Sequence, residues 1–268
     1  MYDWYSHMKA KTALVLSAGG MFGAYQAGAW RELSGSFRPD IVIGTSVGAL
    51  NAWAIVGGCP PDELIRQWTS PAAAAFLQLR MPPLPWRGLF DYDRFSHNIQ
   101  ELYSAFQPRI PCGIVVTDLL RRRPRLVQSA DIRWEHLAAA CAIPAGVRPV
   151  RVDGRLCVDG GLLNAVPLWA AKEMEAGRAV VVNALPRLQS RVVRTVVSAV
   201  RSISPRLPEQ GDLEVVTIAP YSPLGSLMES VRWDRDAVLR SIERGADDAR
   251  RALVELQSGR DPARPVLQ

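Results

Sequence analysis

The sequence predicts an α/β fold in which a central, mostly parallel β-sheet is flanked by helices. Two observations lead to this prediction. An apolar strand, a glycine-rich turn and a helix follow one another twice within the first 56 residues. Further strand and helix patterns then alternate along the chain, as expected where helices connect parallel strands.

The first β–turn–α unit consists of a strand at Lys11–Ser17, a turn with Gly19, Gly20 and Gly23, and a helix at Ala24–Leu33. The strand is predicted because a continuous apolar run ends in glycine. The helix is predicted because apolar residues recur at helical spacing.

The second unit has a strand at Ile41–Ile43, a turn through Gly44, Ser46 and Gly48, and a helix at Ala49–Val56. Further strands are predicted at Cys112–Thr117, Arg125–Gln128, Val150–Val152, Leu156–Val158, Ala179–Asn183 and Glu214–Ile218. Further helices are predicted at Tyr92–Phe106, Trp134–Ala142, Val166–Glu175, Arg191–Ser202 and Asp234–Leu256.

We predict a single domain over residues 1–258 and a polar C-terminal tail over 259–268. Within the domain, residues 59–111 are rich in proline, which interrupts both helix and sheet. Two interpretations of this segment stay open. It is either a connecting part of the fold or a lid that carries apolar residues toward a membrane, namely Met81, Leu84, Trp86, Leu89 and Phe90.

Composition limits the classes of partner. The 268 residues are 48% hydrophobic and 22% charged, which is typical of a globular chain with a sizeable core. The net charge of +6 favours anionic surfaces such as phospholipid headgroups, although it is also compatible with ordinary solubilising charge. It is modest for a nucleic-acid binder, so we expect no nucleic-acid partner.

The four cysteines contain no CxxC pair, so we expect neither a metal site nor a disulfide framework, and we interpret them as small core residues. The N-terminus lacks the pattern of a secretory signal, and no apolar run is long enough to span a bilayer. The expected location is therefore cytoplasmic, with peripheral membrane contact as an extension of that prediction.

Ser46 is the predicted nucleophile. Gly44-x-Ser46-x-Gly48 fits a nucleophile elbow, and it lies directly between a strand and a helix, as an elbow requires. The flanking glycines allow a strained turn and close approach of a substrate. A glycine-rich turn with a capping serine is the alternative interpretation.

A serine needs a base, and histidine is the usual one. The chain has only His7, His97 and His136, and no histidine follows residue 136, where a Ser–Asp–His order would place it. Asp159 is the better candidate, because it follows the strand Leu156–Val158 and precedes two glycines. Carboxylates at strand ends are where open α/β sheets build their sites.

An oxyanion hole is predicted in the turn of the first unit, where the backbone N–H groups around Gly19, Gly20 and Gly23 can converge on one point. Glycine-rich turns of this kind also bind nucleotide phosphates. The sequence lacks a full dinucleotide fingerprint, since Ala18 stands where glycine is needed, and it lacks a P-loop.

These three pieces, in this order, resemble the patatin-like phospholipase family, which combines a glycine-rich oxyanion turn, a GxSxG elbow and a DG[AG] aspartate. The similarity also covers Leu14–Trp30, Ala138–Leu168 and the final helix around Arg244–Leu253. The resemblance implies a three-layer α/β fold, no metal and no organic cofactor. It implies a Ser46–Asp159 dyad without histidine that cleaves lipid or other acyl esters.

Carried over by the same resemblance, Gly19, Gly20 and Gly23 line the oxyanion hole, while Gly44, Gly48 and Gly160 flank the reacting residues. The chain departs from the family pattern at Ala18, usually glycine, and at Phe22, usually a cation. The second departure makes phospholipid preference less secure than esterase activity. Two alternatives remain: a Ser–His–Asp esterase using His136, and a binding protein that kept the fold without catalysis.

Overall fold

The computed structural model describes residues 10–70, 92–144, 146–185, 202, 204–205 and 211–257. The strands are β1 (Lys11–Leu16), β2 (Ile41–Thr45), β3 (Cys112–Asp118), β4 (Arg123–Gln128), β5 (Val150–Val152), β6 (Arg155–Asp159), β7 (Ala176–Val182) and β8 (Glu214–Ile218). The helices are α1 (Gly23–Leu33), α2 (Val47–Val56), α3 (Pro61–Thr69), α5 (Tyr92–Ala105), α6 (Trp134–Ala140), α7 (Leu168–Glu173), α9 (Leu227–Val231) and α10 (Arg235–Gln257).

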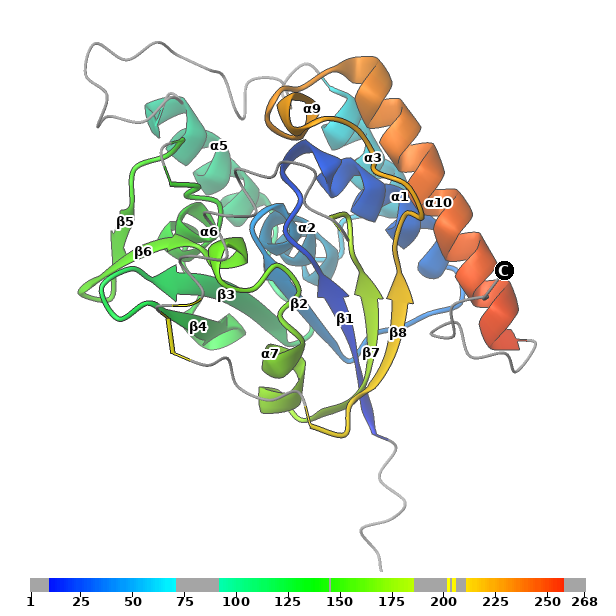
Figure 1. The fold of residues 1–268 in the computed structure, drawn as a ribbon, viewed down its shortest axis with the longest axis horizontal. Coiled ribbons are helices and arrows are strands. Elements are labelled where there is room, and N and C mark those ends of the chain that lie inside the picture. Colours follow the sequence, from blue (N-terminus) through cyan, green and yellow to red (C-terminus); the bar gives the residue numbers. More distant parts are fainter. Residues whose placement is uncertain are drawn as a thin grey trace, which may run out of the picture.

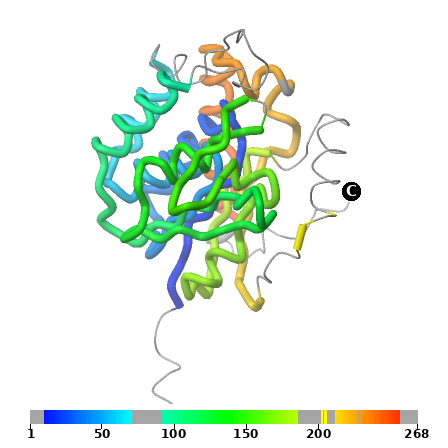
Figure 2. Tube along the Cα trace, turned by 90° about the vertical axis from the view of Figure 1, so that its left-hand side faces the viewer, coloured from blue at the N-terminus to red at the C-terminus, as the bar shows by residue number. Residues whose placement is uncertain are grey.

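The predicted α/β fold is confirmed. Within the described residues, eight strands form one sheet in the order β5-β6-β3-β2-β1-β7-β8, with β4 paired to β3 beside this path. The pairs β1–β2, β1–β7, β2–β3 and β7–β8 are parallel, and β4, β5 and β6 add antiparallel pairs. In both views β1 passes through the middle of the molecule (Figures 1 and 2).

Helices cover both faces of the sheet, which gives three layers. Side chains alternate along the central strands, as the pleat requires. In β1, for example, Leu14 and Leu16 belong to the larger core cluster, which includes residues of α1, α2, α5 and α6, whereas Ala13 and Val15 pack with Trp169 of α7. Both faces of the sheet are thus buried under helices, and this explains the continuous apolar runs of the strands.

Strands β2 and β6 share one edge of β3, and this arrangement positions the site. Antiparallel β4 pairs with Gly113–Asp118 along one edge of β3. The opposite edge pairs with β2 as far as Thr45, opposite Val115, and with β6 from Asp159, opposite Val116. Strands β2 and β6 therefore run toward each other, and their C-terminal ends meet.

One helix departs from the sequence predictions, and three predicted segments lie wholly or mostly outside the described residues. Helix α3 was not predicted, since it falls in the proline-rich segment 59–111, yet Pro61 is at its first position, where its missing N–H costs nothing. The helix predicted at Arg191–Ser202 and the polar tail 259–268 lie outside the described residues, except for Ser202. The lid interpretation also stays a prediction, because residues 71–91 lie outside them.

Helix α1 is held against α10 at two glycines. A Cβ on Gly28 would lie 1.9 Å from the carbonyl oxygen of Ile242, and a Cβ on Gly245 would lie 2.0 Å from that of Tyr25. Glycine is needed at both positions because the backbones touch. Figure 1 shows α1, α3 and α10 packed together at one end of the molecule. This contact fixes α1, which begins directly after the glycine-rich turn.

Candidate active site

Ser46 occupies a strained turn between β2 and α2. Its φ of 54° and ψ of −135° lie in a region that favours glycine, as expected for a nucleophile elbow. The neighbouring glycines make this turn sterically feasible. A Cβ on Gly44 would lie 2.1 Å from the carbonyl oxygen of Gly48, and a Cβ on Gly48 would lie 2.5 Å from that of Leu16.

Ser46 and Asp159, 113 residues apart in sequence, are in direct contact. The Ser46 hydroxyl donates to Asp159 Oδ2 at 2.7 Å, and the backbone N–H of Gly161 donates to Asp159 Oδ1 at 2.7 Å. Gly160 permits this approach, since a Cβ there would lie 2.2 Å from the carbonyl oxygen of Val115. The carboxylate is therefore oriented at both oxygens.

Burial controls the charge of Asp159. Ser46 and Asp159 are 3% and 5% exposed, so the carboxylate is removed from water. This burial raises the pKa of Asp159 from 3.8 to about 7, while the hydrogen bonds from Ser46 and Gly161 act in the opposite direction. A carboxylate with such a pKa is a far better proton acceptor near neutral pH than an ordinary aspartate.

The glycine-rich turn leaves several backbone donors without partners. Within the described part of the chain, no hydrogen bond involves the N–H groups of Gly19, Gly20 or Met21. By contrast, the N–H of Ala18 donates to the carbonyl of Ala165 at 2.9 Å. Gly20 and Met21 line the same cleft as Ser46, so this turn offers donors beside the predicted nucleophile.

Gly23 differs from the other two glycines of the turn. Its N–H donates to the carbonyl oxygens of Gly20 and Met21, so it has no hydrogen left for an oxyanion, and we drop Gly23 from the predicted donors. Its lack of a side chain matters for packing, because a Cβ would lie 2.4 Å from Val47 and 2.6 Å from Trp68. Gly23 lets α1, α2 and α3 approach one another.

Phe22 replaces the cation that the family resemblance led us to expect. The ring is 3% exposed and belongs to the larger core cluster. It lies against the loop before α9, where a Cβ on Gly225 would be 3.3 Å from the ring. Phe22 therefore anchors the turn by apolar packing, and it presents no charge to the cleft.

Gly20→Val is expected to lower kcat by about 10²–10³, with a smaller change in KM, because one oxyanion donor has about this effect. Gly20 has φ +54°, and a Cβ would lie 2.1 Å from the carbonyl oxygen of Ser230, so any side chain displaces the turn. Steady-state kinetics with p-nitrophenyl butyrate measure the change. Gly154→Val is the matched control, since Gly154 also has positive φ but lies in open space. An unchanged kcat in folded Gly20→Val would remove the turn from the mechanism.

A buried polar chain ties the turn to the nucleophile helix. Gln26 donates to the carbonyl of Ser17 at 2.7 Å, and Asn51 donates to Gln26 at 2.9 Å and to the carbonyl of Gly23 at 3.0 Å. The indole N–H of Trp68 donates to Asn51 Oδ1 at 3.0 Å. The sequence analysis missed this chain, although a single asparagine within the apolar helix of residues 47–56 was an available signal.

An apolar cleft of about 330 Å³ opens beside Ser46. Three helices line it, with Leu50 and Ala54 from α2, Leu64 and Trp68 from α3, and Phe95, Leu102 and Phe106 in or just after α5. The apolar residues soon after Asp159, namely Leu162, Leu163 and Val166, do not line the cleft, and Val166 packs on the opposite face of the sheet.

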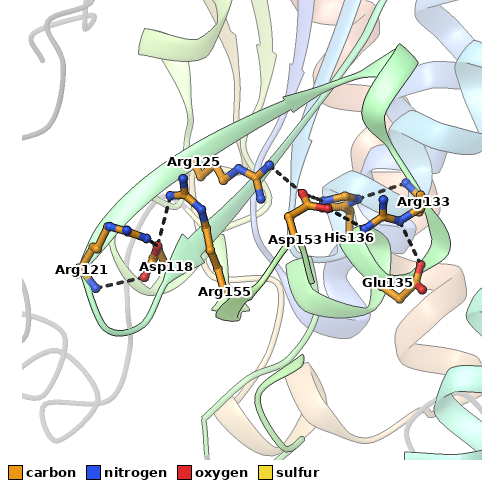
Figure 3. A network of polar contacts seen from close by, with 8 residues as sticks. All are labelled: Asp118, Arg121, Arg125, Arg133, Glu135, His136, Asp153 and Arg155. Atoms are coloured by element: carbon orange, nitrogen blue, oxygen red, sulfur yellow. Dashed lines mark hydrogen bonds and ion pairs between the residues drawn. The ribbon is translucent and has the colours of Figure 1, made fainter. Parts of the chain in front are cut away.

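His136 takes part in a different network, which Figure 3 shows. Its ring is fully buried. Nδ1 accepts from the backbone N–H of Arg133 at 3.1 Å, which places the ring proton on Nε2, 2.9 Å from Asp153. Burial lowers the pKa of His136, although its hydrogen bond to Asp153 opposes this. Both ring nitrogens are thus engaged away from Ser46, which disfavours the Ser–His–Asp alternative.

The remaining candidates lie elsewhere. His97 is exposed on α5 beside Glu101, and His7 lies outside the described residues. Figure 3 also shows Arg121, which is paired with the buried Asp118 at 3.0 Å. All four cysteines are buried and unpaired. The described residues hold no cluster of ligands suited to a metal ion and no helix that could cross a membrane.

Comparison with known proteins identifies similar sequences and a family. A family model described as patatin-like phospholipase matches residues 14–172. Patatin-like phospholipase domain-containing protein 7 of Rattus norvegicus is 26% identical over 173 residues, which are 61% of this chain and 13% of that protein. An uncharacterized NTE family protein of Mycobacterium bovis is 29% identical over 167 residues, 59% of this chain and 44% of that protein. The chain thus spans less than half the length of these relatives.

Among solved structures, VipD from Legionella pneumophila is similar, with a TM-score of 0.53 and 12% identity over 92% of this chain and 67% of that chain. At this identity the likeness shows a shared fold. The family-model match covers more than half of the chain, and it includes the glycine-rich turn, Ser46 and Asp159. The chain belongs to the patatin-like phospholipase family.

Proposed function

We propose that the protein is a serine acyl hydrolase that cleaves lipid-type carboxylic esters, with Ser46 as nucleophile and Asp159 as base. The observation that carries this proposal is the 2.7 Å hydrogen bond from the strained Ser46 hydroxyl to a buried carboxylate. The adjoining apolar cleft and the unpaired N–H groups of the turn supply the two other parts that an esterase needs.

In the first half-reaction, Asp159 takes the Ser46 proton while Oγ bonds to the ester carbonyl carbon. The electron pair of the carbonyl moves onto its oxygen, where the N–H groups of Gly19 and Gly20 stabilise the negative charge. Collapse of this intermediate breaks the bond to the alcohol oxygen. The protonated Asp159 returns the proton to the departing alcohol, which leaves Ser46 acylated.

In the second half-reaction, water attacks the acyl carbon and Asp159 takes one of its protons. Collapse then expels Ser46 Oγ, which regains the proton from Asp159, and the free acid leaves. One carboxylate thus serves as base and then as acid in each half. A pKa near 7 suits both roles, because the group gives and takes a proton with little bias at neutral pH.

The structure supports cleavage of carboxylic esters in general better than a preference for phospholipids. Phe22 is buried and neutral, so the turn lacks the cation that would hold a phosphate. Contact with an anionic membrane and a cytoplasmic location stay predictions from the sequence. The partner that the site supports directly is an ester with an apolar acyl chain.

The decisive experiment treats the protein with a fluorophosphonate probe, which phosphonylates activated serines. We expect labelling at Ser46, located by peptide mass spectrometry, together with hydrolysis of p-nitrophenyl butyrate. A folded protein that neither labels nor hydrolyses would instead be the binding protein considered above. If His136→Gln abolished labelling while Asp159→Asn kept it, the histidine alternative would replace the dyad.

A further inference from the structure

We propose that the cleft beside Ser46 is an acyl-binding channel of limited length, which makes the protein selective for medium-chain acyl esters of about eight to ten carbons. This inference rests on the function proposed above. It follows from the direction of the three lining helices and from the position of Phe106 at the end of the lining farthest from Ser46.

Helix α5 runs beside α2 in the same direction. The rings of Trp53 and Tyr103 stack at 5.1 Å between centroids. One turn further along, a Cβ on Gly57 would lie 2.5 Å from the Cβ of Phe106. Since these contacts advance together along both helices, the beginning of α5, with Phe95, lies toward Ser46.

Helix α3 returns along the cleft in the opposite direction. It begins at Pro61, shortly after α2 ends, and its Trp68 donates to Asn51 near the start of α2. Trp68 therefore lies at the catalytic end, and Leu64 lies nearer the far end. Asn51, the polar residue of α2 in this lining, pairs with Trp68 at the catalytic end. Beyond it, Leu50, Ala54 and Leu64 offer apolar walls to an acyl chain attached to Ser46.

The length of the channel follows from helix geometry. Ser46, Leu50 and Ala54 line it along one face of α2, and eight residues of α-helix rise about 12 Å. A zigzag hydrocarbon chain with bonds of about 1.5 Å advances about 1.3 Å per carbon, so about nine carbons fill this length. Phe106 lines the cleft and packs on Gly57, beyond Ala54, so we place the far end of the channel at its ring.

The test compares p-nitrophenyl esters of two to sixteen carbons, each below its micelle concentration. We expect kcat/KM to rise up to about fourfold per buried methylene, to peak at about eight to ten carbons and then to fall. Phe106→Ala should move the peak to longer chains by two or more carbons. Ala54→Leu, which adds bulk inside the channel, should move it to shorter ones.

Phe37→Ala is the matched control, because Phe37 is a half-buried phenylalanine that packs against the same core without lining the cleft. It should leave the peak in place. A wild-type rate that rises to sixteen carbons, or a peak that a folded Phe106→Ala variant does not move, overturns the channel. If Ser46 still labels and butyrate is still hydrolysed in that case, the proposed function stands. If no ester is cleaved and no probe binds, both proposals fall.

Discussion

Ser46→Ala is expected to lower kcat for ester hydrolysis by on the order of 10⁶, which is the cost of removing a catalytic serine in a comparable site. No other hydroxyl donates to Asp159 among the described residues, so nothing can replace the attacking oxygen. Initial rates with p-nitrophenyl octanoate, at high enzyme concentration, measure the residual activity.

The fold should survive this change, since alanine is smaller than serine and the turn geometry is unaltered. Circular dichroism and the unfolding temperature check this point. Ser241→Ala is the matched control, because Ser241 is also a buried serine but lies on α10. Activity of Ser46→Ala within tenfold of the wild type would contradict the assignment of the nucleophile.

Asp159→Asn is expected to lower kcat/KM by on the order of 10⁴, because asparagine cannot accept the serine proton. The pH profile gives the sharper test. In the proposed mechanism only the carboxylate form of Asp159 is active, and burial raises the pKa of Asp159 to about 7. In the wild type, kcat/KM should therefore fall about tenfold for each pH unit below this value. The residual activity of Asp159→Asn should lack this acid limb.

The histidines provide the contrast for this profile. A triple variant with His7→Asn, His97→Asn and His136→Gln should keep the acid limb if Asp159 is the base. Among the described interactions, neither His97 nor His136 contacts Ser46. Glutamine at position 136 retains a donor for Asp153, which favours folding. Loss of the limb in this variant, with its retention in Asp159→Asn, would identify histidine as the base.

The raised pKa of Asp159 should make the folded protein more stable at low pH, whereas it makes the enzyme less active there. Because its pKa is higher in the folded than in the unfolded chain, the folded protein binds more protons between pH 3.8 and about 7. Asp159 therefore contributes to the stability of the folded state at low pH, and this contribution is lost as the pH rises through that interval. Asp159→Asn removes the buried charge, so its unfolding temperature should exceed that of the wild type by more at pH 8 than at pH 4.

The sequence led to Ser46 and Asp159 because their local signals were strong, and the structure brings these two side chains into contact. Gly44, Ser46 and Gly48 lie between a strand and a helix, and Asp159 ends an apolar strand before two glycines. The mostly parallel sheet was predicted for the same reason, since apolar strands and helices alternate.

The cleft could not be predicted in this way. Its lining depends on how α3 and α5 pack on α2, and side-chain spacing within one helix does not specify a partner helix. The spacing of Leu64 and Trp68 indicates only an apolar face. The role of Gly23 was misjudged for a similar reason, because whether its N–H is free depends on the turn closing upon itself. The residues of β6 alone also did not indicate that this strand runs antiparallel to β3.

The meeting of β2 and β6 on one edge of β3 has a consequence for how the chain refolds. Only the pairing of Asp159 with Val116 keeps the carboxylate in line with Ser46. A slip of β6 by one residue would turn every side chain of that strand to the other face of the sheet. Such a misaligned chain could place Val158 at the position of Asp159 and still be compact, but Ser46 would then lack the carboxylate beside it. Covalent labelling of Ser46 during refolding would therefore report strand alignment, which compactness and helix content do not distinguish.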